Sequence, residues 1–203
     1  MHIACLDFEG VLVPEIWVGL AERTGVEALR ATTREIPDYH ELMTMRLRIM
    51  TERGLKFADI LSAAEGLEPL PGAREFLDWL RTEYQVAIVS DTFYELALPL
   101  LRKLGYPMML CHRLSVGADG ALTGYRLRQP DPKRQSVRGF KSLQYKVVAT
   151  GDSYNDVPML QEADRSWFFC PPDNVVSDHP GIAVARSYAE LKAAFTQAKR
   201  DLD

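Results

Sequence analysis

The composition of this 203-residue chain, with 47% hydrophobic and 26% charged residues, is that of an ordinary globular protein with a real core. Its net charge of −4, without a run of basic residues, argues against nucleic-acid binding. Since no apolar stretch approaches the roughly 18 residues that span a bilayer, and no basic segment leads into a long apolar one, we expect a cytoplasmic protein that acts on small molecules without a membrane partner.

Short apolar runs rich in β-branched residues recur along the chain and predict strands. They cover residues 2–8, 85–91, 108–114, 146–152 and 166–172. Amphipathic patterns over 72–84 and 93–105 read as the helices that connect some of these strands, the second ending at Gly105. Such alternation of strands and helices predicts a parallel α/β sheet.

Residues 15–69 interrupt this alternation, because they carry helical patterns with no strand between them. The patterns cover 15–25, 26–35, 38–54 and 56–66. Pro14 precedes the block, and Pro69 and Pro71 follow it, as expected at the boundaries of an insertion. We therefore predict a core domain of residues 1–14 and 70–203 and a four-helix cap of residues 15–69.

Two further patterns complete the predicted elements. Residues 114–127 contain Asp119-Gly120 between two short runs, which predicts a small β-hairpin attached to the core. Residues 187–199 open with Ser187 and Glu190 at capping-box spacing, which predicts a final helix. The three cysteines are widely spaced, so we expect reduced thiols rather than disulfides or a zinc site.

Polar residues stand at the carboxyl ends of three predicted strands. They are Asp7 and Glu9, then Ser90 and Asp91, then Asp152, Ser153, Asn155 and Asp156. Ligands bind at this edge of open parallel sheets, so we expect these side chains to converge. Crowded carboxylates repel each other, and an oxygen-only donor set suits Mg²⁺. The alternative is that each acid only caps a strand or helix, which explains any one of them better than all together.

Arg46 lies on an apolar face of its predicted helix. Leu42 and Met43 precede it by one turn, and Ile49 and Met50 follow it by one turn. A guanidinium there either extends to solvent or binds a substrate carboxylate in a bidentate manner. Glu15, after Pro14, is the candidate for a substrate ammonium, although an acid in a first helical turn needs no such role.

Four stretches stand in the order and approximate spacing of the motifs of the haloacid-dehalogenase-like phosphatases: DFEGV (7–11), VAIVSD (86–91), DPKRQSV (131–137) and GDSYNDVPML (151–160). The chain resembles that superfamily from residue 3 to about residue 170, which implies a Rossmann-like α/β core. Within it, the sequence is similar to the phosphoserine phosphatases. It most resembles the branch that is also a homoserine phosphotransferase, where a glutamate occupies the second acidic position.

The resemblance implies a role for each candidate residue. Asp7 would be the nucleophile and Glu9 the general acid-base, while Ser90, Asp91 and Asn155 would contact substrate. Mg²⁺ would be held by Asp7, the backbone carbonyl of Glu9 and Asp152, with Asp156 either coordinating the ion or orienting a bound water. Lys133 would neutralise nucleophile and phosphate, with Arg134, Arg138 and Lys141 as rivals. Glu15 and Arg46 match the family's amino-acid-binding pair.

Two positions depart from the common phosphoserine phosphatase pattern. Glu9 is one methylene longer than the usual aspartate, and Asp91 replaces a glycine. The resemblance to the phosphotransferase branch implies that both favour transfer to an alcohol such as homoserine over transfer to water. The expected function is a Mg²⁺-dependent phosphoserine phosphatase that forms an aspartyl-phosphate and also phosphorylates homoserine. The alternatives are a phosphatase for another small phosphate monoester and a non-catalytic regulatory module of the same fold. The sequence neither requires nor excludes a homodimer.

Overall fold

The computed structural model describes residues 1–36 and 38–203 and is built around one sheet. Its strands are β1 (His2–Leu6), β2 (Gln85–Phe93), β3 (Met108–Val116), β4 (Leu122–Arg126), β5 (Lys146–Gly151), β6 (Arg165–Phe169) and β7 (Ala183–Ala185). They lie in the order β4-β3-β2-β1-β5-β6-β7, and every pair is parallel except β3 and β4. The predicted α/β fold with a parallel sheet is confirmed.

Alternate residues of the central strand face opposite sides of the sheet, and helices cover both sides. These helices are α4 (Ala73–Glu83), α5 (Tyr94–Lys103), α6 (Pro132–Ser142), α7 (Val157–Glu162), α8 (Asp173–Asp178) and α9 (Tyr188–Leu202). Ala4 and Leu6 belong to the apolar cluster that includes α4, α5 and α9, whereas Ile3 and Cys5 belong to the one that includes α6, α7 and α8.

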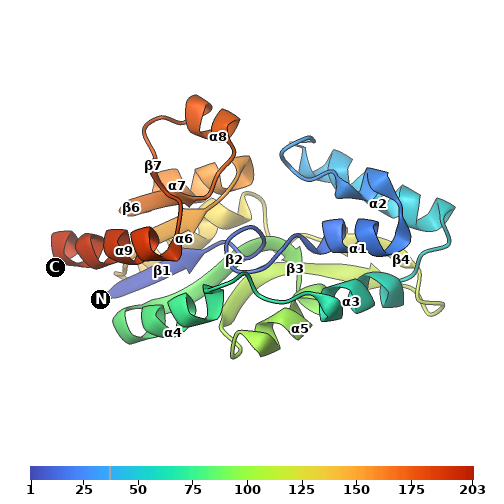
Figure 1. Cartoon of the computed structure of the whole chain (residues 1–203), viewed down its shortest axis with the longest axis horizontal. Helices are drawn as coiled ribbons and strands as arrows, with labels where there is room; N and C mark the ends of the chain where they lie inside the picture. The colour runs from blue at the N-terminus through green and yellow to red at the C-terminus, as the bar shows by residue number, and fades with distance from the viewer. Residues whose placement is uncertain (37) are drawn as a thin grey trace.

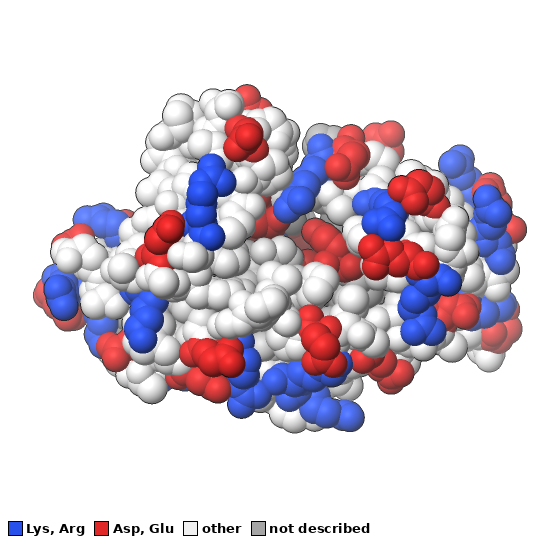
Figure 2. Space-filling view, viewed as in Figure 1, with Lys and Arg blue, Asp and Glu red and all other residues white. Residues whose placement is uncertain are grey.

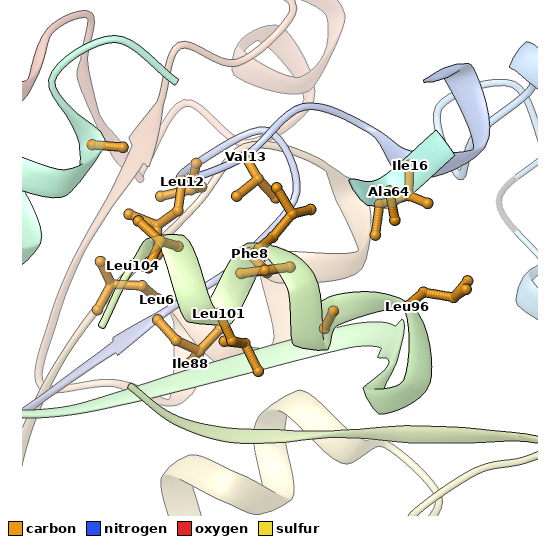
Figure 3. Packing of buried hydrophobic residues seen from close by; sticks show 14 of the residues in the cluster. Leu6, Phe8, Leu12, Val13, Ile16, Ala64, Ile88, Leu96, Leu101 and Leu104 are labelled. Carbon is orange, nitrogen blue, oxygen red and sulfur yellow. The ribbon is translucent and has the colours of Figure 1, made fainter. Parts of the chain in front are cut away.

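Figure 3 shows part of the first cluster, in which Leu6 and Leu12 lie beside Leu101 of α5 and Leu104, which directly follows this helix. Both sides of β1 are therefore covered by apolar side chains. The loop that follows this strand is anchored to the same core, since Phe8, Leu12 and Val13 are fully buried. The acidic residues of that loop are thus held on a rigid support.

The described residues of the segment between β1 and α4 contain no strand, and they form fewer α-helices than predicted. It forms α1 (Ile16–Thr24), the short 3-10 helix η1 (Glu27–Arg30), α2 (Tyr39–Glu52) and α3 (Phe57–Gly66). The prediction of a helix over 26–35 was wrong beyond the short Glu27–Arg30 segment. Ala31 is extended, and the N–H and hydroxyl of Thr32 both donate to Glu35 Oε2 (2.8 and 3.0 Å) instead of continuing the helical bonds. Helices α1, α2 and α3 lie at one end of the molecule and both termini at the other (Figure 1).

The predicted hairpin is present, but it is part of the main sheet. β3 pairs with β2 on one side and with β4 on the other, so β4 is an antiparallel edge strand rather than a separate appendage. Gly120 supplies the positive φ (+79°) of the connecting turn. The final helix is also confirmed, and the hydroxyl of Ser187 accepts the N–H of Glu190 at its start.

Two further expectations from the sequence concern membrane-spanning segments and the cysteines. Within residues 1–36 and 38–203, none of the helices combines the length and the apolar character that crossing a membrane requires. The three cysteines are free; Cys5 is buried, but Cys170 is exposed and is no core thiol.

Candidate active site

The carboxyl ends of β1 and β5 bring three carboxylates together. Asp7 directly follows β1, where its N–H donates to the carbonyl of Thr150 in β5 (3.0 Å). Asp152 directly follows β5, and Asp156 ends the short helix η2 (Tyr154–Asp156). One oxygen from each of the three carboxylates lies within 4.8 Å of the others, and the residues are only 5%, 2% and 0% exposed. The sheet register thus creates a buried acidic cluster.

Two glycines allow the backbone to approach these carboxylates closely. Gly10 has a φ of +79°, and a Cβ added to it would lie 2.6 Å from the carboxylate of Asp152. A Cβ added to Gly151 would lie 2.2 Å from the carboxyl carbon of Asp156. Asp156 is fixed further by the N–H groups of Asp152 and Ser153, which donate to its Oδ2 at 2.9 and 3.1 Å. The geometry leaves no room for side chains at either glycine.

Lys133 is the basic residue that reaches the cluster. It stands in the first turn of α6, is 2% exposed, and places its Nζ 2.6 Å from Asp156 Oδ1, 3.1 Å from Asp7 Oδ1 and 3.8 Å from Asp91 Oδ2. Burial by itself lowers the pKa of Lys133, but the carboxylates of Asp156, Asp7 and Asp91 outweigh burial and raise it well above its usual value.

The three rivals of Lys133 lie elsewhere on α6. Arg134 pairs with Asp131, Arg138 with Glu162, and Lys141 with Asp164, all at 3.0 to 3.3 Å in partly or well exposed positions. Their ion pairs are local to the surface of the helix and its neighbours. Lys133 is therefore the member of this group that can act on a ligand at Asp7.

A second cation reaches the cluster from the segment between η1 and α2. Arg34 donates from Nη2 to Oδ2 of Asp152, a contact between residues 118 positions apart in the chain. No local sequence pattern identified Arg34 in advance. The guanidinium is 35% exposed while the Asp152 side chain is 3% exposed, so the pair spans the boundary between solvent and the buried cluster.

The donor set fits a hard divalent cation. Burial raises the pKa of Asp7 well above its usual value, Asp156 and Asp152 add to the effect, and Lys133 opposes it. Burial and Asp156 likewise raise the pKa of Asp152 to about 6 against the pull of Arg34. Asp7 Oδ1 lies near the Lys133 ammonium, yet in the described part of the chain it accepts no aligned hydrogen bond. Crowded carboxylate oxygens of this kind are the ligands that Mg²⁺ prefers.

One pocket joins this cluster to the segment between β1 and α4. Among the predicted site residues, its lining includes Asp7, Glu9, Glu15, Arg46, Ser90, Asp91, Asp152 and Asn155. Lys133 and Asp156 are buried behind that lining. Figure 2 shows acidic side chains in the recess between the surface over α8 and the surface over α1 and α2. The pocket therefore has an acidic end at the sheet and a second end among the inserted helices.

Arg46 and Glu15 form that second end. Arg46 is 5% exposed; its Nη2 donates to the carbonyl of Ala31 (2.9 Å), and its guanidinium lies 4.7 Å over the ring of Trp17. Its buried Nε has no partner among the residues described. Burial lowers the pKa of Arg46, and the nearby carboxylates of Glu9 and Glu15 oppose this shift. Arg46 also lines the pocket, so it places a buried cation there. Burial and the nearby Glu9 raise the pKa of Glu15 well above its usual value.

Glu9 lies between the two ends of the pocket. Its carboxylate is outside the cluster of three, because Oε2 accepts the N–H of Ile16 at the start of α1 (3.0 Å). This bond holds the side chain at a helix N-terminus, where negative charge is favoured. The carboxylate of Glu9 thus lines the same pocket as Asp7 without being part of the acidic cluster.

An irregularity in β2 turns Ser90 and Asp91 into the pocket. The register between β2 and β3 shifts between Val89 and Phe93, and such bulges commonly redirect side chains at functional sites. Ser90 is buried and its Oγ accepts the N–H of Thr92 (3.2 Å). Asp91 accepts a hydrogen bond from the Asn155 amide at 2.9 Å, and its backbone carbonyl accepts the hydroxyl of Tyr39 from α2 at 2.6 Å.

Comparison with known proteins identifies the class of protein. A family model of haloacid dehalogenase-like hydrolases matches residues 1–164. The chain therefore belongs to the haloacid dehalogenase-like hydrolases. It is also 57% identical over 198 residues to a phosphoserine phosphatase of Pseudomonas syringae pv. tomato, covering 98% of this chain and 84% of that protein.

Other relatives agree with this assignment. The phosphoserine phosphatase ThrH of Pseudomonas aeruginosa is 56% identical over 198 residues, with 98% of this chain and 97% of that protein covered. A solved structure of a substrate-bound phosphoserine phosphatase complex has a TM-score of 0.78 at 22% identity, over 95% of this chain and 97% of the other, which shows a shared fold. The relationship to the phosphoserine phosphatases, including the branch of ThrH, is thus confirmed.

Proposed function

We propose that this chain is a Mg²⁺-dependent phosphoserine phosphatase that works through a phosphoryl ester on Asp7 and that also transfers the phosphoryl group to homoserine. The observation that carries the proposal is one pocket with Asp7 and the acidic cluster at one end and Arg46 with Glu15 at the other. The two relatives that are 57% and 56% identical are both named phosphoserine phosphatases, which supports phosphoserine as the substrate.

The acidic end of the pocket carries the chemistry. A carboxylate oxygen of Asp7 attacks phosphorus as the bond from phosphorus to the serine oxygen breaks, and Glu9 donates a proton to that oxygen. Lys133, 3.1 Å from Asp7, neutralises charge on the nucleophile and on the phosphoryl oxygens, while Ser90 and Asn155 donate hydrogen bonds to those oxygens. Asp7, the backbone carbonyl of Glu9 and Asp152 would hold Mg²⁺, with Asp156 either coordinating it or orienting a bound water, and the bound ion would supply positive charge for the buried carboxylates and the phosphate.

The second half of the reaction regenerates Asp7. A hydroxyl group attacks phosphorus, Glu9 accepts its proton, and the bond between phosphorus and the Asp7 oxygen breaks. With water as the acceptor the product is inorganic phosphate, and with homoserine it is phosphohomoserine. The longer side chain of Glu9 and the carboxylate of Asp91 in place of glycine are the features of this chain that favour the alcohol.

Recognition of the amino acid belongs to the inserted helices. The Nε of the buried Arg46, which has no partner among the described residues, binds the substrate carboxylate, and Glu15, once ionised, receives the ammonium group. Residues 15–69 accordingly act as a cap on a core of residues 1–14 and 70–203 and exclude bulk water while the phosphoryl ester exists.

A single incubation tests the proposal. Protein, Mg²⁺, phosphoserine and homoserine are combined, and inorganic phosphate and phosphohomoserine are measured by mass spectrometry. We expect both products, and neither from Asp7→Asn. Inorganic phosphate alone would contradict the transfer to homoserine. Inert phosphoserine together with rapid cleavage of an unrelated phosphate monoester would contradict the substrate.

A further inference from the structure

The structure contains a buried histidine that faces a carboxylate of the pocket and has no role in the chemistry above. His112 lies in β3 and is 2% exposed. Its Nδ1 accepts the backbone N–H of Arg128 at 3.2 Å, so the neutral ring carries its hydrogen on Nε2. That nitrogen lies 3.4 Å from Oδ1 of Asp91. The ring is also held edge-on by Tyr39, with ring centres 5.8 Å apart.

Asp91 connects this histidine with two residues that serve the phosphate. While Oδ1 faces His112, Oδ2 accepts the amide of Asn155 at 2.9 Å and lies 3.8 Å from Nζ of Lys133. Four elements therefore meet at one carboxylate: β2, β3, η2 and α6. The carboxylate is kept ionised, since burial alone raises its pKa but Lys133, His112 and Asn155 together bring the pKa below its usual value.

We propose that His112 is a positioning residue that acts through Asp91. By fixing the rotamer of Asp91, it holds the Asn155 amide and the Lys133 ammonium in place for the phosphoryl oxygens over Asp7. The role assigned to Lys133 and Asn155 rests on the proposed function. His112 itself touches no substrate atom, and its influence is on the rate of phosphoryl transfer rather than on recognition of the amino acid.

A double-mutant cycle tests this inference with two substrates, phosphoserine and p-nitrophenyl phosphate. Loss of one charge-assisted hydrogen bond predicts that His112→Phe lowers kcat about tenfold and leaves KM within about twofold for both substrates. Gln can still donate to Asp91, so His112→Gln recovers most of this loss. In an Asp91→Asn background, His112→Phe causes no further loss, because the two residues act as a unit.

His2 provides a matched control at the opposite end of the sheet. Its Nε2 also lies near a carboxylate, 3.5 Å from Asp203, and its side chain is 9% exposed. His2→Phe should leave kcat unchanged. Additive effects of His112→Phe and Asp91→Asn, or equal losses in His112→Gln and His112→Phe, would overturn the inference.

A spectroscopic measurement covers the case in which His112→Phe does not fold or the parent protein hydrolyses neither substrate. Nitrogen-15 NMR of the parent should show the hydrogen of His112 on Nε2, and the Nε2 resonance should shift in Asp91→Asn while that of His2 does not. An Nε2 resonance of His112 that is indifferent to Asp91→Asn would overturn the pairing. Failure of hydrolysis alone would overturn the proposed function and leave the pairing intact.

Discussion

The surroundings of Arg46 restrict which group it can bind. It is buried, lies over Trp17, and has a buried Nε without a partner in the described part of the chain. Loss of charged hydrogen bonds worth ~1.5–3 kcal/mol predicts that Arg46→Ala raises KM for phosphoserine about 10- to 100-fold. The KM for p-nitrophenyl phosphate, which lacks the carboxylate, should change little.

Arg48 of the same helix is the control for that measurement, since its side chain is 68% exposed and, in the described part of the chain, its ion pair is with Glu52 one turn away. Arg48→Ala should leave both KM values unchanged. Equal increases in KM for both substrates in Arg46→Ala would show that Arg46 does not recognise the amino acid.

Gly10 determines whether Asp152 can occupy its position. Its φ is +79°, and an added Cβ would lie 2.6 Å from the Asp152 carboxylate. Backbone strain together with this clash predicts that Gly10→Ala lowers the free energy of unfolding by about 2 kcal/mol or more and removes turnover. Urea denaturation and the hydrolysis assay measure the two effects.

Gly139 of α6 shows what the same substitution does without those constraints. It lies inside a helix, and among the described residues no heavy atom beyond its chain neighbours and its own helical backbone comes within 4 Å of an added Cβ. Gly139→Ala should raise stability by about 0.5–1 kcal/mol. Full activity in Gly10→Ala would contradict the prediction, because it would show that the backbone around the acidic cluster can shift to make room for a Cβ at residue 10.

The strand-end pattern in the sequence predicts those site residues that directly follow a predicted strand. Asp7 and Asp152 follow apolar runs directly, and parallel strands must present these ends at one edge. Arg34 and His112 are outside this pattern. Their partners lie 118 and 21 positions away, by the differences 152 − 34 and 112 − 91, and only the tertiary fold decides these pairs.

At the scale of elements, predictions are correct where the apolar periodicity is strong and wrong where contacts outside that pattern decide the structure. The helices α4, α5 and α9 have strong apolar periodicity, and each begins and ends close to the predicted residues. The stretch 26–35 also contains helix-favouring residues, yet only Glu27–Arg30 forms a 3-10 helix. Thr32 and Glu35 bond to each other across a tight turn, and such local side-chain bonds compete with helical ones.

That turn delivers Arg34 to Asp152, so the segment between η1 and α2 links the inserted helices to the sheet. Without Arg34, the largely buried carboxylate of Asp152 would lose a partner of opposite charge. We expect Arg34→Gln to lower the stability of the metal-free protein at pH 7 by ~1–3 kcal/mol, between the values for exposed and buried pairs. Added Mg²⁺ should then stabilise the variant more than it stabilises the parent.

Arg30→Gln is the matched control for this measurement, because Arg30 pairs with Glu22 and Glu27 at the surface. Thermal unfolding with a chelator and with Mg²⁺ gives both quantities for each protein. An equal gain from Mg²⁺ in the parent and in Arg34→Gln would show that the arginine and the ion do not share the charge of Asp152.

At the scale of the whole molecule, strand order decides where the chemistry lies. β1 is flanked by β2 and β5, and these neighbours supply Asp91 and Asp152 on either side of Asp7. Apolar runs predict that strands exist, but they do not state which strands are neighbours, because every buried parallel strand has the same pattern. The strand-end pattern therefore predicts that a site exists at one edge of the sheet, and the strand order decides which carboxylates stand beside Asp7.

Because the acidic cluster joins β1, β5 and η2, its charge should influence global unfolding. Burial and Asp156 raise the pKa of Asp152 to about 6 from an ordinary value of 3.8, so between these values the folded, metal-free protein binds more protons than the unfolded chain. The contribution of Asp152 to stability is therefore complete below pH 3.8 and is lost as pH rises through about 6. A divalent cation replaces those protons and restores the lost stability.

We consequently expect Mg²⁺ to raise the melting temperature more at pH 7 than at pH 5, where protons compete for the same oxygens. At a concentration 100 times the dissociation constant, the stabilisation should be about 2.7 kcal/mol. Calorimetry of the parent and of Asp152→Asn at both pH values measures this difference, and the variant should respond weakly to Mg²⁺ at either pH. A response to Mg²⁺ that is the same in Asp152→Asn and in the parent would place the ion away from the carboxyl ends of β1 and β5.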